Sequence, residues 1–198
     1  MGTQHCIRYT TLLYLLSGLA GLFMHAAQAA TTERPDAELR QILTDAISSS
    51  DSFEDRFDAE VWLSDMSSRL QPRVRDPEKR LFILKTIHYE AKRAALEPEL
   101  ILAVINVESN FDRFAISSAG AQGLMQIMPF WLDEIGQPED NLIDIRTNVR
   151  FGCTILSHYL KREHGDLYRA LARYNGSVGK RWYPDRIFKS LSGRWYKQ

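Results

Sequence analysis

The stretch that decides the fold begins as Ala103-Val-Ile-Asn-Val-Glu-Ser109 and resumes as Gly120-Ala-Gln-Gly-Leu-Met-Gln-Ile-Met-Pro129. Four apolar side chains on and before the first part recur at helical spacing: Leu100, Ala103, Val104 and Val107. The connecting segment 115–123 is rich in Ser, Ala and Gly, which is typical of a loop. Glu108 is therefore predicted to lie near the end of an apolar helix that leads into a loop.

Helical spacing also dominates the chain on both sides of this stretch. Asp76 is a good helix N-cap, and Pro77 suits the first helical position. Further helices are predicted over 99–109, 130–135, 144–163 and 166–174, and no segment has a clear strand alternation. The expected fold is mainly α, with irregular loops.

The residues before this domain divide into two parts. An apolar run over 11–23 follows Arg8 and precedes Ala27-Gln-Ala29, which predicts a signal peptide over 1–29 and export to the periplasm. Residues 30–76 predict a short helical segment, with helices over 37–47 and around 53–66, and then a linker. The catalytic domain is expected over 77–198, without a membrane span in the mature chain.

The composition excludes several classes of protein. Apolar residues make up 44% and charged residues 25% of the chain, the balance of a globular protein, and the net charge is zero. A nucleic-acid-binding protein would normally have a basic excess. Cys6 and Cys153 are the two cysteines, and the histidines show no ligand grouping, so neither a disulfide scaffold nor a metal or cofactor site is expected.

Glu108 is the candidate catalytic residue. A carboxyl group in apolar surroundings loses hydration, which raises its pKa and lets it hold a proton near neutral pH. Such a group can donate that proton to a leaving oxygen. A glutamate at a helix end is more often a solvated surface residue, so the argument depends on its context.

That context resembles a known family. Glu108-Ser109, the Gly120–Pro129 segment and Ala172-Arg-Tyr-Asn-Gly176, in this order, are similar to the soluble lytic transglycosylase (SLT) domain, over about residues 80–190. The resemblance implies a lysozyme-like fold. It also implies cleavage of the β-1,4 bond between N-acetylmuramic acid and N-acetylglucosamine without water, which leaves a 1,6-anhydro end.

The same resemblance implies roles for individual residues. Glu108 would protonate the bridging oxygen and then take the proton of the C6 hydroxyl that attacks C1. Six substrate-binding residues are carried over: Ser117, Met125, Gln126, Tyr174, Asn175 and Tyr183. In the family the tyrosine that matches Tyr174 points at the catalytic glutamate, and Asp144, Asn148 and Gly152 match a pattern that we interpret as structural.

The chain departs from the family at one place. Many relatives carry an acidic residue before the tyrosine that closes the groove, whereas this chain reads Lys180-Arg-Trp-Tyr-Pro184. Tyr183 is thus expected to be the groove tyrosine without the acidic neighbour that many relatives carry.

The number of carboxyl groups near the scissile bond bears on the mechanism. Most glycoside hydrolases use two, one on each side of the bond. Asp112 lies four residues after Glu108, which would place it on the same helix face, and the sequence does not place Asp144 in space. A mechanism with one glutamate is the simpler reading.

Two other functions stay open. One is a hydrolytic muramidase like the goose-type lysozymes, and the other is a glycan-binding scaffold with low turnover. The expected partners are peptidoglycan strands, and the small size weakly favours work for a cell-envelope secretion or motility assembly.

Overall fold

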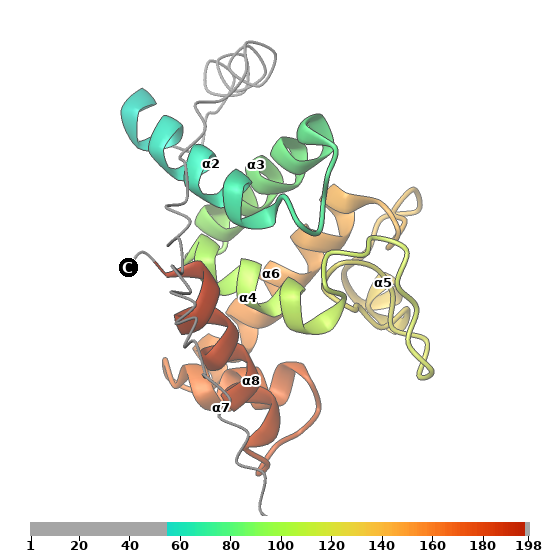
Figure 1. The fold of residues 1–198 in the computed structure, drawn as a ribbon. Helices are drawn as coiled ribbons and strands as arrows, with labels where there is room; N and C mark the ends of the chain where they lie inside the picture. The colour runs from blue at the N-terminus through green and yellow to red at the C-terminus, as the bar shows by residue number, and fades with distance from the viewer. Residues whose placement is uncertain (1–54, 197–198) are drawn as a thin grey trace, which may run out of the picture. The chain divides into compact units, whose positions relative to one another are not determined.

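The computed structural model describes residues 55–196. The predicted signal peptide and the helix predicted over 37–47 lie outside these residues. The described part consists of helices α2 (Arg56–Leu70), α3 (Pro77–Arg93), α4 (Pro98–Glu108), α5 (Phe130–Ile135), α6 (Ile145–Arg162), α7 (Leu167–Tyr174), α8 (Trp182–Ser190) and η1 (Leu191–Trp195), a short π-helix. The predicted mainly helical fold is confirmed (Figure 1).

Aspartate caps begin three of the predicted helices. Asp76 accepts a hydrogen bond from the Lys79 amide at the start of α3, and Asp144 and Asp166 do the same for α6 and α7. Each side chain satisfies one of the amides that the first helical turn leaves without a partner. These local signals explain why the beginnings of the helices were readable from the sequence.

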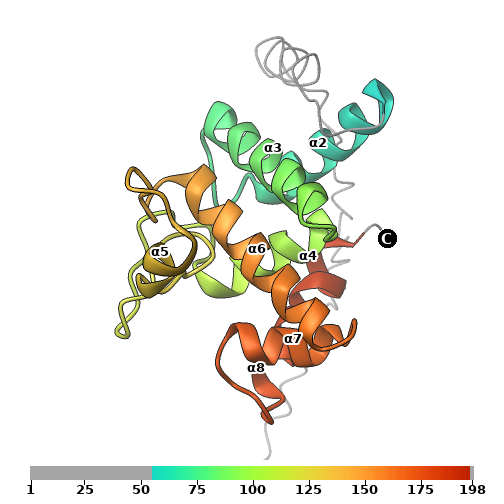
Figure 2. The same cartoon turned by 180° about the vertical axis from the view of Figure 1, so that it is seen from behind.

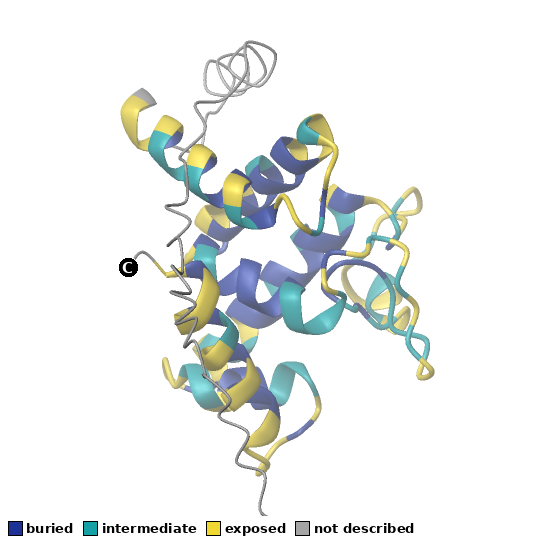
Figure 3. Cartoon of the chain, viewed as in Figure 1, coloured by how far each residue is buried: buried dark blue, intermediate teal, exposed yellow. Residues whose placement is uncertain are grey.

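Helix α4 forms the centre of the core. Residues 100–105 are all buried, and most of the helix has the colour of buried residues in Figure 3. Helix α4 packs against α3, α8 and η1, and α6 passes behind it in Figure 1 and in front of it in Figure 2. An apolar helix surrounded in this way holds its last residue, Glu108, in a fixed position.

The front helix α2 shares this core. Leu63, Met66 and Leu70 are at most 1% exposed. The buried Arg80 of α3 donates to Ser67 Oγ at 2.8 Å and to the Val74 carbonyl at 2.7 Å, which ties α2 and the following linker to the domain. A domain boundary at residue 76 remains a prediction.

The C-terminal helices were not predicted from the sequence. Tyr183 of α8 and Trp195 of η1 are at most 1% exposed and pack in the core. Trp182 and Phe188 of α8, and Tyr196 directly after η1, lie on the surface. Arg69 of α2 donates to the carbonyls of Arg194 and Tyr196, at 2.6 and 3.1 Å. These contacts fix the end of the chain that carries Tyr183.

Residues 109–144 form a lobe of loops around α5, to one side of the helices (Figure 1). Its only β pairing within the described chain is two isolated bridges, from Gln122 to Ile116 and to Ile127. Across residues 55–196, no helix combines the length and the apolar character that a membrane crossing would require.

Candidate active site

Glu108 ends helix α4 and faces a cavity of about 260 Å³. The loop lobe supplies one wall of this cavity, through Ser117, Ala119, Ala121, Gln126, Ile127, Met128 and Trp131. Ile155, Tyr174 and Asn175 from α6 and the end of α7 supply the other. Among the described residues that line it, Glu108 is the only one with a carboxyl side chain.

Tyr183 is the direct partner of Glu108. Its buried hydroxyl donates a hydrogen bond of 2.6 Å to Glu108 Oε1. Burial raises the pKa of Tyr183 well above its ordinary value, and the nearby Glu108 adds to this, so the phenol stays protonated and acts as a donor.

Burial raises the pKa of Glu108 to about 7. The Tyr183 hydrogen bond and the charge of Arg186 act in the opposite direction, because both favour the carboxylate, but they do not cancel the effect of burial. Glu108 can therefore hold or release a proton near neutral pH, as a group that is acid and then base requires.

The segment opposite Glu108 is anchored by Asn148 on α6. This buried amide accepts a hydrogen bond from the Met125 amide at 2.7 Å, and it donates to the carbonyls of Gln122 and Leu142, each at 2.8 Å. Ser109 adds a hydrogen bond of 2.8 Å to the Leu124 carbonyl. The residue that follows Glu108 thus holds the loop that forms the facing wall.

Close packing explains the two glycines next to this anchor. A Cβ atom on Gly123 would collide with Asn148 and with the Leu142 carbonyl, and the φ of +77° at this residue is one that glycine adopts most readily. A Cβ atom on Gly152 would collide with the side chain of Met125. Asn148 and Gly152 are structural residues, as predicted, and Asp144 is the N-cap of α6.

Two of the predicted substrate residues lie on the loop wall. Ser117 Oγ accepts a hydrogen bond from the Ala121 amide at 3.0 Å. Gln126 has a φ of +51°, and its amide nitrogen donates to the carbonyls of Ala115 and Gly123, at 3.1 and 2.9 Å. Since these contacts use the nitrogen of the Gln126 amide, the carbonyl oxygen is the part suited to accept from a ligand.

The predicted sugar contact of Met125 needs correction. Its side chain is 0% exposed and packs against Gly152, so it does not reach the cavity. Met128 lines the cavity instead. The main chain turns between the two methionines at Gln126, which determines the direction of each side chain.

The two tyrosines differ from the expected arrangement. Tyr174 lines the cavity with Asn175, but its hydroxyl donates to the Met125 carbonyl at 2.7 Å, and the hydroxyl that contacts Glu108 belongs to Tyr183. Tyr183 is 1% exposed, which corrects its expected contact with the sugar: it contacts the carboxyl group rather than the open groove.

Neither of the other two acids considered lines the cavity. Asp112 is exposed, caps the Phe114 amide at 2.9 Å and borders a different pocket, which Arg73 and Lys79 also line. Asp144 is occupied as a helix cap. Over residues 55–196, no three side chains of His, Cys, Asp or Glu gather in a way that could hold a metal ion.

Sequence comparison adds the family to this geometry. Residues 85–192, more than half of the chain, match the family described as "Transglycosylase SLT domain". The chain belongs to this family. Helices α4, α6, α7 and α8, with the loop lobe, lie within the matched region, so every residue of the candidate site falls inside the SLT domain.

Sequence comparison also finds similar proteins that are named as transglycosylases. The transglycosylase of Enterobacteria phage PRD1 is 30% identical over 115 residues, which is 54% of this chain and 42% of the relative. Membrane-bound lytic murein transglycosylase C of Yersinia enterocolitica is 30% identical over 112 residues, 48% of this chain and 31% of the relative. The protein of the same name from Actinobacillus pleuropneumoniae is 48% identical over 46 residues, 23% of this chain and 13% of the relative. The chain thus spans less than half the length of each relative.

A solved structure of a lytic transglycosylase, Slt of Pseudomonas aeruginosa, matches 77% of this chain and 29% of that chain, with 23% identity and a TM-score of 0.45.

Several residues of the cavity were not singled out from the sequence. Met128, Trp131 and Ile155 line it, although none of the three is among the substrate-binding residues that the family resemblance implied. Trp131 lies two residues after the end of the family motif at Pro129 and is half-buried, so an aromatic residue close to that motif was the available signal.

Proposed function

We propose that this chain is a peptidoglycan lytic transglycosylase that cleaves the β-1,4 bond between N-acetylmuramic acid and N-acetylglucosamine without water. The observation that carries the proposal is Glu108 itself, a partly buried carboxyl whose pKa is raised to about 7 and which lines a cavity without a second carboxyl among its described residues. Membership of the SLT family supports the same reaction.

One residue then carries both proton transfers. Protonated Glu108 donates its proton to the bridging oxygen, the bond from that oxygen to C1 breaks, and the N-acetylglucosamine side leaves as an alcohol. The Glu108 carboxylate next takes the proton of the C6 hydroxyl while that oxygen bonds to C1. The product is a 1,6-anhydro ring, and Glu108 is protonated again, so no water is consumed.

Tyr183 positions the carboxyl group for both steps. Its hydroxyl holds Oε1, so the other carboxyl oxygen, Oε2, is the one we assign to the proton transfers. A fixed hydrogen bond also stabilises the carboxylate that forms between the steps without the reorganisation that a water molecule would need.

The substrate would lie between the loop wall and the helix wall. Gln126 and Ser117 offer polar contacts for the hydroxyl and acetamido groups of the sugars, and Asn175 offers an amide from the opposite side. Met128 and Trp131 offer apolar surface for sugar faces.

We place this activity in the periplasm, on the strength of the predicted signal peptide and of relatives named membrane-bound lytic murein transglycosylases.

The test compares two variants on purified peptidoglycan, each of which replaces a carboxyl group by an uncharged amide. Glu108→Gln keeps the shape of the side chain and an oxygen that can accept from Tyr183, but it cannot donate or take up a proton near neutral pH. We therefore expect cleavage to fall by about 10³-fold or more. Asp112→Asn is the matched control, since Asp112 lies outside the cavity, and it should cleave at the rate of the wild type. Comparable cleavage by Glu108→Gln and wild type would remove the proposal.

A further inference from the structure

A second pocket, of about 300 Å³, lies on the other side of α7 from the Glu108 cavity. Ala172 and Arg173 line this pocket, and the next two residues, Tyr174 and Asn175, line the cavity. The last turn of α7 is therefore a shared wall, and a ligand in one space would lie close to a ligand in the other.

The pocket is rich in positive charge. Four cationic side chains line it against one carboxyl, Glu163: Arg169, Arg173, Lys180 and Arg181. Glu163 pairs with two of these cations, and Asp185, beside the pocket, lies 3.8 Å from Nε of Arg181, so four cations have two counter-charges. The excess of positive charge produces a positive potential that attracts anions.

Glu163 holds two of these cations in place. Its side chain is 5% exposed, and it forms ion pairs with Nε of Arg169, at 2.8 Å, and with Nε of Arg173. Both contacts use Nε, so the terminal amino groups of each guanidinium remain suited to bind a second anion. Because the two arginines are already ordered, binding would cost less conformational entropy.

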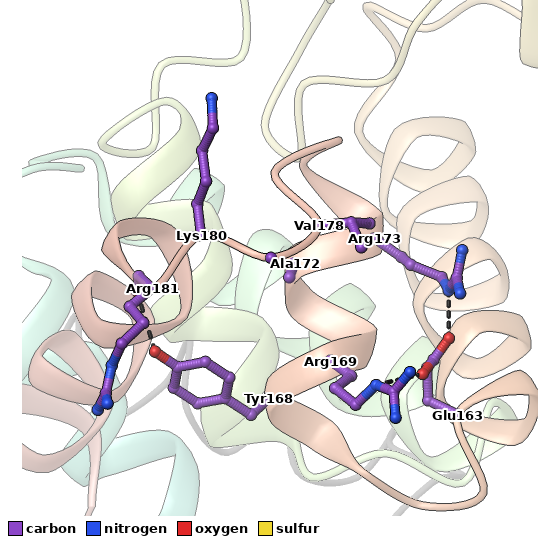
Figure 4. Close-up of a pocket in the computed structure, with 9 residues that line it drawn as sticks. Glu163, Tyr168, Arg169, Ala172, Arg173, Val178, Lys180 and Arg181 are labelled. Carbon is purple, nitrogen blue, oxygen red and sulfur yellow. Dashed lines mark hydrogen bonds and ion pairs between the residues drawn. The ribbon is translucent and has the colours of Figure 1, made fainter.

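The arrangement of the pocket suggests the kind of anion. Figure 4 shows Arg169 and Arg173 with Glu163 on one side and Lys180 and Arg181 on the other, with Ala172 and Val178 between them. Two cationic sides with a small apolar surface between them suit a short peptide that has carboxylates separated by small side chains.

We propose that this pocket binds the carboxylates of the stem peptides that glycan strands carry, and so selects peptide-bearing strands. The inference rests on the proposed function, because a peptidoglycan strand in the cavity would bring its peptides to the shared wall. Arg169 and Lys180 would contact the peptide from opposite sides, while Glu108 acts on the glycan.

The variant to test removes one cation from each side, as Arg169→Gln/Lys180→Gln. Arg169 is two-thirds exposed and Lys180 lies on the surface, so the fold should tolerate both changes. Lys92→Gln/Lys189→Gln is the matched control, since it removes two exposed positive charges that line neither space.

The first measurement is KM on peptide-bearing strands and on the same strands after an amidase has removed the peptides. We expect the variant to raise KM about tenfold on peptide-bearing strands, because charge-assisted contacts are lost, with KM on stripped strands and kcat unchanged. The control should match the wild type on both. An equal change on both substrates, or no change on either, would overturn the inference.

The second measurement does not depend on cleavage. Isolated stem peptide should bind to the full chain in a calorimetric titration, with Kd about tenfold weaker for the variant. Inorganic phosphate or an unrelated acidic oligopeptide that bound as tightly would overturn the assignment to stem peptides. Peptide binding without any cleavage by the wild type would instead count against the proposed function alone.

Discussion

The hydroxyl of Tyr183 lies 2.6 Å from Oε1 of Glu108, and both groups belong to helices that pack against each other, α8 and α4. The Glu108 carboxyl thus has a buried donor on one oxygen, while burial keeps its pKa near 7. Burial raises the pKa of Glu108, whereas the Tyr183 hydrogen bond and the charge of Arg186 lower it, and the balance of these effects determines the pH at which Glu108 changes charge.

Replacement of Tyr183 by Phe should move this pH upward. Loss of the hydrogen bond removes a contact that favours the carboxylate, and such charge-assisted bonds contribute about 1.5–3 kcal/mol. The pKa of Glu108 should rise by about one unit, and with it the alkaline limb of the pH–rate profile, where the proton donor is lost. Tyr174→Phe is the control, because the Tyr174 hydroxyl donates to the Met125 carbonyl rather than to Glu108. The alkaline limb of its pH–rate profile should lie at the same pH as that of the wild type. An unshifted limb in Tyr183→Phe would contradict this assignment.

The raised pKa of Glu108 also predicts how stability depends on pH. The folded state binds this proton more tightly than the unfolded state, so between the ordinary carboxyl pKa of 4.5 and about 7 the folded protein loses stability as pH rises. Glu108→Gln removes this penalty. Above about pH 7 the variant should exceed the wild type in free energy of unfolding by up to about 3 kcal/mol, and below about pH 4 the two should converge.

Urea unfolding at several pH values measures this difference. An equal difference at all pH values would mean that the effect does not come from the titration of Glu108.

Met125 and Met128 should respond differently to the same substitution. Met125 is fully buried against Gly152, so Met125→Ala should lower the free energy of unfolding by about 2–5 kcal/mol. Met128 lines the cavity, so Met128→Ala should raise KM for glycan with a smaller loss of stability. Thermal unfolding and steady-state kinetics on both variants test the pair, and the reverse pattern would restore Met125 as the groove residue.

The sequence was informative where structure is determined locally. Asp76, Asp144 and Asp166 cap helices because a short acidic side chain can reach the next amides without help from the rest of the fold. The apolar spacing before Glu108 likewise identified α4, and its burial follows from a helix that is apolar over most of its surface.

The sequence was less informative where the outcome depends on distant contacts. Which tyrosine meets Glu108 is decided by how α8 packs on α4, and no local pattern predicted α8 itself. Which methionine faces the cavity is decided by Asn148 and Gly152, which hold Met125 inward from a helix more than twenty residues away in the chain. At these positions, tertiary packing therefore gives the side chains contacts that differ from the roles implied by the family resemblance.

The most direct test of the central claim is the product formed on purified glycan strands in water enriched in ¹⁸O. If Glu108 alone gives and then takes the proton, mass spectrometry should find 1,6-anhydro-muramic ends without incorporated ¹⁸O, and Glu108→Gln should form almost none. Reducing muramic ends that carry ¹⁸O would show that water attacks C1, and would contradict the account.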